Sequence, residues 1–188
     1  MVPSRAVFGY LPDHLRRGAR ILFVGINPGI RSAAVGHHFA GPSNRFWKLL
    51  FQAGLVDEPL TYKDDWRLPE WRLGVTNVIA RATVGIDNLH PAEYRSGVFG
   101  LEHKVRRYRP RTIAFLGVTI FRMLFPEISR SDRLLLGPTR VALAGRPVFL
   151  LPNPSGRNAH YSYDRMLKTF ISLRKQATPP PRSKRGIL

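Results

Sequence analysis

The chain has 188 residues, 44% of them hydrophobic, which suits one globular domain with a sizeable core. It has no cysteine, and this excludes disulfides, iron–sulfur clusters and the cysteine-ligated zinc site of base deaminases. Thirty lysines and arginines against twelve acidic residues give a formal charge of +18. Such a charge favours a polyanionic partner, most simply nucleic acid. A solvated basic surface without such a partner is the alternative interpretation.

The sequence has no apolar run long enough to cross a bilayer, and its N-terminus lacks the pattern of a signal peptide. We therefore expect no association with membranes. A protein with a nucleic-acid partner is then expected in the cytoplasm or nucleoid of a bacterium, or in the nucleus of a eukaryote.

The first half of the chain is expected to alternate strands, loops and helices. In chain order we predict an arm with a short helix over residues 1–19, a buried strand over 21–24 and a loop over 30–41. A helix over 42–54, an acidic loop over 55–72 and a second strand over 74–79 follow. The helix is expected to open at Pro42, a favoured first-turn position, and to end at Gly54. Its buried face is predicted to comprise Phe46, Leu49, Leu50 and Ala53.

The second half continues this alternation. We predict helices over 91–109, 118–125 and 161–174, a strand over 112–116, and a hairpin of 141–144 and 147–151 that turns at Gly145 and Arg146. Apolar residues at helical spacing are Tyr94, Val98, Leu101, Val105 and Tyr108 in the first helix, and Met166, Leu167, Phe170 and Ile171 in the last. From Gln176 the chain is basic and proline-rich, which is typical of disorder. Strands alternating with helices predict one α/β domain over residues 20–175, a three-layer α/β/α fold with a central, mainly parallel sheet.

Two short loops follow apolar strands and are the most informative part of the sequence. Residues 25–29 read GINPG after the run 21–24, and residues 153–158 read NPSGRN after the run 148–151. Ligands of open α/β sheets bind outside the carboxyl ends of the strands, so the two loops could form one site. Neither loop contains a carboxylate, a histidine or a cysteine. Chemistry at such a site must rely on amides, hydroxyls and backbone dipoles.

Four motifs occur in a characteristic order: GINPG at 25–29, GHHFAGPSNRFWK at 36–48, GVTN at 74–77 and NPSGR at 153–157. On these motifs the chain, from about residue 20 to 174, resembles the mismatch-specific uracil/thymine DNA glycosylases, a branch of the uracil-DNA glycosylase superfamily. The resemblance implies that family's fold and a monomer acting on double-stranded DNA with G·U or G·T mismatches. It implies a monofunctional enzyme of base excision repair that flips out uracil or thymine and hydrolyses the N-glycosidic bond, leaving an abasic site.

The resemblance assigns the catalytic role to Asn27. Its amide oxygen can hold the attacking water below the sugar, but an amide takes no proton near neutral pH and is no general base. The rate must then come from positioning and electrostatics, which predicts a slow enzyme. Taken alone, an asparagine before a proline is more often a turn residue.

The resemblance also suggests residues that bind the flipped base. Phe39 is expected to stack on the pyrimidine, and Asn77 to pair with its Watson–Crick edge. Ile26 and Ser32 are expected to shape the floor of the pocket, and His38 to contact the base or a phosphate. Outside the motifs, each of these residues would read as an ordinary core, turn or structural residue.

The loop at 153–158 is expected to bind DNA. Arg157 resembles the side chain that fills the gap left by the flipped base and reads the opposite guanine; a phosphate contact is the alternative. Ser155 is expected to bind a phosphate, and Gly156 to permit its close approach. Asn153 and Asn158 complete the predicted DNA-binding set.

Three alternatives stay open at this stage. GINPG could cradle a nucleotide phosphate in another class of enzyme, although the GxxxxGK[ST] loop and a magnesium-binding aspartate are missing. The chain could bind mismatches or damaged bases without cleaving them. It could also be a broader uracil or deaminated-base glycosylase that disregards the opposite base. No metal or organic cofactor is expected, because the six histidines form no zinc spacing with cysteines or carboxylates.

Overall fold

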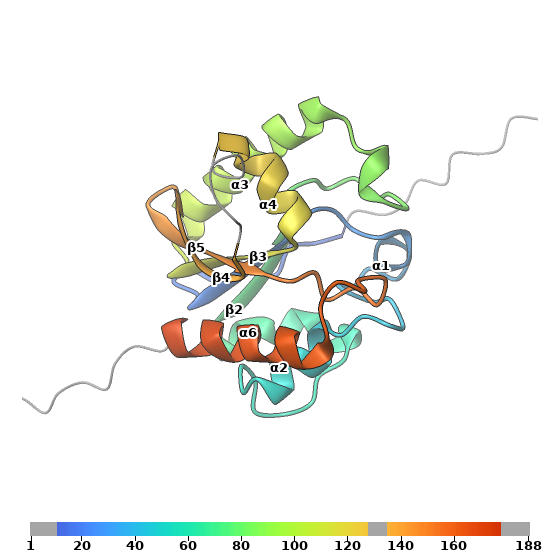
Figure 1. The fold of residues 1–188 in the computed structure, drawn as a ribbon, viewed down its shortest axis with the longest axis vertical. Helices are drawn as coiled ribbons and strands as arrows, with labels where there is room; N and C mark the ends of the chain where they lie inside the picture. Colours follow the sequence, from blue (N-terminus) through green and yellow to red (C-terminus); the bar gives the residue numbers. More distant parts are fainter. Residues whose placement is uncertain (1–10, 128–134, 178–188) are drawn as a thin grey trace, which may run out of the picture.

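A five-stranded sheet forms the centre of the computed structural model, which describes residues 11–127 and 135–177 (Figure 1). The strand order is β2-β1-β3-β5-β4, with bounds β1 Ile21–Gly25, β2 Leu73–Asn77, β3 Thr112–Leu116, β4 Gly137–Leu143 and β5 Arg146–Leu151. The pairs formed by β1, β2, β3 and β5 are parallel, and only the β4–β5 pair is antiparallel. The predicted three-layer fold with a mainly parallel sheet is confirmed.

Helices cover both faces of the sheet, α2 and α6 on one face and α3 and α4 on the other (Figure 1). The helical bounds are α1 Ile30–Val35, α2 Phe46–Gln52, η1 Tyr62–Trp71, η2 Ile86–Asn88, α3 Pro91–Tyr108, α4 Val118–Leu124 and α6 Tyr163–Ala177, where η marks 3₁₀ helices. No helix in the described ranges is long and apolar enough to span a membrane.

The central strands are apolar along their whole length because both of their faces are covered. All five residues of β1 are buried, and their side chains alternate between two core clusters. Phe23 packs with Phe46 and Phe170 beneath α2 and α6. Leu22 belongs to the cluster on the α3 side, with Phe121 of α4. The core thereby fixes the sheet, and the sheet fixes where its carboxyl-end loops begin.

Three predictions for the first half of the chain are wrong in detail. Residues 30–41 contain the short helix α1, and residues 55–72 contain η1, whose 3₁₀ geometry lacks the 3.6-residue period that marks an α-helix. Helix α2 begins at Phe46, not at Pro42. The oxygen Oδ1 of Asn44 accepts the Phe46 N–H at 3.0 Å, and this side-chain contact marks the true start.

Several boundaries also differ from the prediction. β2 ends at Asn77, β4 begins as early as Gly137, and the hairpin turns at Ala144 and Gly145, both with positive φ. Helix α6 includes Gln176, and Leu167 and Ile171 on it are only partly buried. Residues 11–19 contain no helix; His14 forms an isolated bridge to Val75 instead. The rest of the predicted arm (1–10) and tail (178–188) lies outside the described residues.

Candidate active site

A cleft of about 1310 Å³ opens at the carboxyl ends of the parallel strands. Both loops singled out in the sequence, 25–29 and 153–158, line this one cleft although β3 separates their strands. Every residue predicted for the site lines it: Ile26, Asn27, Ser32, His38, Phe39, Asn77, Asn153, Ser155, Gly156, Arg157 and Asn158. The topology therefore gathers these side chains around one space.

The charge of the cleft is entirely positive. Among the described residues that line it, Arg31, Arg122 and Arg157 carry charge, and none is an aspartate or glutamate. A polyanion is therefore the chemically matched ligand. The described lining also offers no carboxylate general base, so a reaction here depends on how neutral groups are placed.

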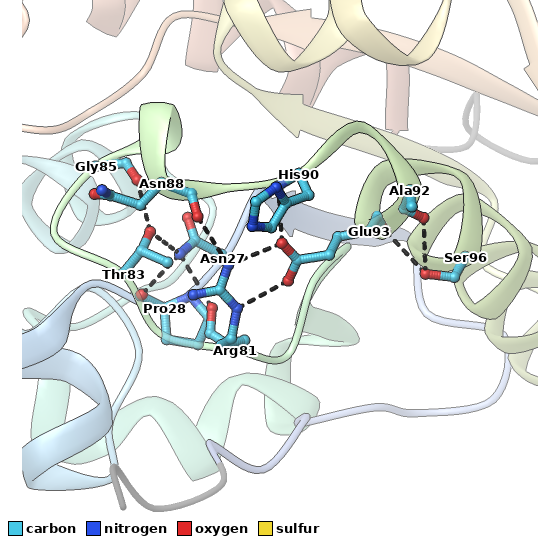
Figure 2. A network of polar contacts seen from close by, with 10 residues as sticks. All are labelled: Asn27, Pro28, Arg81, Thr83, Gly85, Asn88, His90, Ala92, Glu93 and Ser96. Atoms are coloured by element: carbon cyan, nitrogen blue, oxygen red, sulfur yellow. Dashed lines mark hydrogen bonds and ion pairs between the residues drawn. The ribbon is translucent and has the colours of Figure 1, made fainter. Parts of the chain in front are cut away.

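The side chain of Asn27 is anchored through its nitrogen (Figure 2). Nδ2 donates to Thr83 Oγ1 at 2.7 Å and to the carbonyl oxygens of Pro28 and Arg81, each at 3.2 Å. A carbonyl can only accept, so the NH₂ end must face this group. Oδ1 has no hydrogen-bond donor in the described part of the chain. It is therefore free to accept a hydrogen bond from water.

Phe39 and Asn77 meet beside the end of β1. Asn77, 9% exposed, is the register partner of Gly25, and a Cβ at position 25 would lie only 2.6 Å from Asn77 Oδ1. Any side chain at position 25 would therefore push the amide of Asn77 away from the end of the strand. Phe39 adopts a left-handed φ of 53°, and its ring packs 4.1 Å from that of Phe46. An aromatic face and an amide therefore border the same part of the cleft.

Ser32 and His38 are engaged in internal contacts. Ser32 Oγ accepts the Ala40 N–H at 3.1 Å, which ties α1 to the segment carrying Phe39. The ring of His38 is buried, and its Nε2 lies 2.9 Å from the carbonyl oxygen of Pro12. Burial lowers the pKa of His38, so the neutral imidazole is favoured. The Pro12 carbonyl thus engages Nε2 within the protein, and a contact of His38 with a base or a phosphate stays a prediction.

The buried carboxylate of Asp65, on η1, was missed in the sequence. It is 1% exposed; Oδ1 lies 2.9 Å from His37 Nδ1, and Oδ2 accepts the His38 N–H at 2.8 Å and lies 3.3 Å from His14 Nε2. Burial alone would raise the pKa of Asp65, but the nearby His14 and His37 side chains and the hydrogen bond from the His38 N–H together lower it to about 2. Asp65 therefore anchors, as an anion, the segment that presents Phe39.

The same cluster contains ligand-type atoms that sequence spacing did not reveal. Atoms of His14, His38 and Asp65 suited to a metal lie within 4.8 Å of one another. However, His38 Nε2 faces the Pro12 carbonyl, and both Asp65 oxygens face nitrogen atoms within hydrogen-bonding distance. These atoms of His38 and Asp65 already belong to the hydrogen-bonded anchor of the segment that carries Phe39.

The loop 153–158 is held by its own asparagines. Asn153 Oδ1 accepts the Ser155 N–H at 3.0 Å, while Asn158 Nδ2 donates to the Asn153 carbonyl at 2.8 Å. Gly156 packs against Ser43: a Cβ there would collide with the Ser43 side chain and lie 2.7 Å from its carbonyl oxygen. Glycine at position 156 is thus required by the packing of the loop against Ser43 within the protein. The side chains of Asn153 and Asn158 fix the shape of the loop.

Arg157 reaches across the cleft. Its Nη1 donates to the carbonyl oxygen of Val84 at 3.5 Å, a long contact between exposed groups. Val84 is 71% exposed and belongs to the loop after β2 that also carries Thr83. The guanidinium is therefore weakly held and free to turn toward a ligand.

The fold and the cleft together define an α/β protein with a cationic, amide-lined site at the carboxyl edge of its sheet. The sequence matches the uracil DNA glycosylase superfamily over residues 12–174, and the chain belongs to that superfamily. Membership makes it a DNA glycosylase, an enzyme that hydrolyses the N-glycosidic bond of a base.

A solved structure supports the fold. A protein from Methanosarcina acetivorans, described as a candidate uracil DNA glycosylase, is 22% identical with a TM-score of 0.61. The alignment covers 89% of this chain and 97% of that chain. At this level of identity the similarity concerns the fold, which the two proteins share over almost their whole length.

Proposed function

We propose that the chain is a mismatch-directed DNA glycosylase that removes uracil or thymine from G·U and G·T pairs in double-stranded DNA. One observation carries the proposal: the amide of Asn27 stands in the cleft with its nitrogen anchored and its oxygen free (Figure 2). Extruding a base costs a few kcal/mol, and least for a mismatched pair. A site built on positioning is therefore best matched to bases that are already weakly paired.

In the proposed reaction, Oδ1 of Asn27 accepts a hydrogen bond from water and holds it against the sugar carbon. The bond from that carbon to the base nitrogen breaks with both electrons going to the base, while water adds to the carbon and releases its proton, by way of solvent water, to the departing base. No cleft carboxylate lies in the described residues to take this proton, so the gain comes from alignment of the water and from electrostatics. We expect slow turnover.

The base is proposed to enter between Phe39 and Asn77. Stacking on an aromatic ring is worth about 1–3 kcal/mol per base. The amide of Asn77 offers both a donor and an acceptor, which matches the alternating groups on the edge of uracil or thymine. Ile26 and Ser32 form the surrounding wall, with Ser32 acting by fixing the segment of Phe39.

Arg157 is proposed to leave the Val84 carbonyl and fill the space vacated by the extruded base. Its planar guanidinium can stack on neighbouring bases and donate to the acceptors of the opposite guanine. Ser155, whose oxygen accepts the Arg157 N–H at 3.3 Å, keeps a hydroxyl proton for a phosphate oxygen beside the lesion. The preference for a guanine opposite is thus assigned to this loop.

The test is single-turnover cleavage, with enzyme in excess, of labelled duplexes carrying G·U, G·T or A·U and of single-stranded uracil DNA; alkali then reveals abasic sites. We expect G·U to be cleaved fastest, G·T more slowly and A·U poorly. Equal cleavage of every uracil substrate would replace the proposal with a general uracil glycosylase. Tight binding without any cleavage would instead indicate a protein that only binds mismatches.

A further inference from the structure

The loop that follows β2 contacts the side-chain nitrogen of Asn27 and holds the amide in place (Figure 2). It supplies two of the acceptors of Asn27 Nδ2, namely the Arg81 carbonyl at 3.2 Å and Thr83 Oγ1 at 2.7 Å. Thr83 Oγ1 in turn donates to the carbonyl oxygen of Gly85 at 2.7 Å. Whatever holds this loop therefore sets the rotation of the amide and the direction of its free oxygen.

An ion pair joins this loop to the first turn of α3 (Figure 2). Arg81 Nε and Nη2 donate to Glu93 Oε1 and Oε2 at 2.9 and 2.8 Å, and Nη2 also donates to the carbonyl of Asn88 at 2.8 Å. Glu93 Oε2 accepts the His90 N–H at 2.8 Å, so one carboxylate caps the helix and holds the loop. The Arg81 guanidinium and the His90 N–H lower the pKa of Glu93 to about 2, which keeps it ionised at neutral pH.

We propose that Arg81 and Glu93 form a positioning pair for Asn27, acting through the Arg81 carbonyl and Thr83. The effect on rate rests on the proposed function of Asn27, whereas the effect on its amide does not. The Arg81 and Glu93 side chains are 50% and 26% exposed, so the pair adds little to global stability. The ion pair is bidentate and lies at the base of the loop that follows β2. Its main effect is therefore to keep this loop in one conformation.

The pair is tested by Glu93→Gln and Arg81→Met, alone and together, with Glu70→Gln as the matched control. Glu70 pairs with Arg67 on η1, in an exposed ion pair that makes no contact with the loop. We expect each single substitution to lower the saturated single-turnover rate on G·U DNA about tenfold, which corresponds to about 1.4 kcal/mol of barrier. The double variant should lose little more, because both changes break the same link.

Glu93→Gln and Arg81→Met change the net charge in opposite directions, which distinguishes an effect on the position of Asn27 from an effect on DNA affinity. By charge alone, Glu93→Gln would strengthen DNA binding and Arg81→Met would weaken it. A positioning role lowers the rate at saturating enzyme in both variants. Rates that move in opposite directions would overturn the proposal.

A second readout does not depend on activity. The side-chain NH₂ signals of Asn27 are identified in a ¹⁵N–¹H NMR spectrum by their absence in Asn27→Ala, and their hydrogen exchange with water is measured. We expect faster exchange in Glu93→Gln and Arg81→Met, and wild-type exchange in Glu70→Gln. Melting temperatures establish that the variants are folded.

The two readouts distinguish the possible failures. Suppose that the wild-type protein cleaves no base but that the Asn27 amide exchanges faster in the variants. This result supports the positioning pair and contradicts the proposed function. Unchanged exchange in both variants overturns the pair, whatever the rates do. Faster exchange with an unchanged cleavage rate overturns its role in the reaction.

Discussion

The side-chain nitrogen of Asn27 lies 2.7 Å from the hydroxyl oxygen of Thr83, 56 positions further along the chain. That hydroxyl accepts from Asn27 and donates to the Gly85 carbonyl, so its proton is committed. The contact turns a flexible amide into a fixed one, on a residue that lines the cleft and whose side-chain oxygen has no donor in the described part of the chain. Preorganisation of this kind is how a site without a general base can contribute to rate.

Thr83→Val removes the acceptor while keeping the shape of the side chain, and Thr83→Ser keeps the acceptor. A net hydrogen bond is worth about 1 kcal/mol, and a freed amide also loses orientation. We therefore expect the single-turnover rate on G·U DNA to fall about tenfold in Thr83→Val and to stay near wild type in Thr83→Ser. Equal rates in all three proteins would show that Thr83 does not orient Asn27.

Gly156→Ala tests how closely the DNA-binding loop packs on the rest of the cleft. The added methyl group would collide with Ser43, so the loop must shift. We expect weaker binding to G·U duplexes by about tenfold or more, measured by fluorescence anisotropy. The double variant Ser43→Gly with Gly156→Ala should recover part of the affinity, because it removes the two Ser43 side-chain atoms that the methyl group would meet first. Absence of any recovery would contradict a steric cause.

Asp65→Asn tests the buried anchor through the dependence of stability on pH. The folded-state pKa of Asp65, about 2, lies below its ordinary value of 3.8, so ionised Asp65 stabilises the fold above about pH 4 and this stabilisation is lost toward pH 2. The difference in the free energy of unfolding between wild type and variant, on the order of 2 kcal/mol near neutral pH, should shrink below pH 4. Urea unfolding across this range measures it, with the exposed Glu70→Gln as control. A difference that stays constant down to pH 3 would argue against an anionic anchor.

The sequence was sufficient to predict features that depend on local pattern. The run 21–24 is continuously apolar because β1 is buried on both faces, and this made the strand easy to predict. Strands β1 and β5 both end at the same edge of the parallel sheet. The loops that follow them were therefore expected to line one cleft, as they do. The motif residues then identified the lining of the cleft.

The contacts that hold these residues in place were not predictable in the same way. Asp65 meets His37 across 28 positions and Thr83 meets Asn27 across 56, and neither pair follows a helical or strand period. Asp65 lies on a 3₁₀ helix, whose spacing does not reveal its inward face. The contact of His38 Nε2 with the Pro12 carbonyl, which is close only in the fold, was equally unpredictable from the sequence.

Arg157→Ala tests the reader of the opposite base, with Arg107→Ala as a control for charge. Arg107 is exposed in the last turn of α3, which leads to the amino end of β3, opposite the cleft. We expect Arg157→Ala to reduce the preference for G·U over A·U, since a bidentate contact to guanine gives about 1–3 kcal/mol of discrimination. Arg107→Ala should leave the preference unchanged. If Arg157→Ala weakens all duplexes equally and only lowers the salt dependence of binding, Arg157 is a phosphate contact.

The central claim is that the free oxygen of Asn27 directs the water that cleaves the N-glycosidic bond. The most direct test compares wild type with Asn27→Ala in single-turnover cleavage of a G·U duplex, together with binding to the same duplex carrying an uncleavable uracil analogue. We expect cleavage to be lost and binding to remain within a few fold of wild type, because the base and backbone contacts are untouched. Cleavage at the wild-type rate in Asn27→Ala would remove Asn27 from the mechanism.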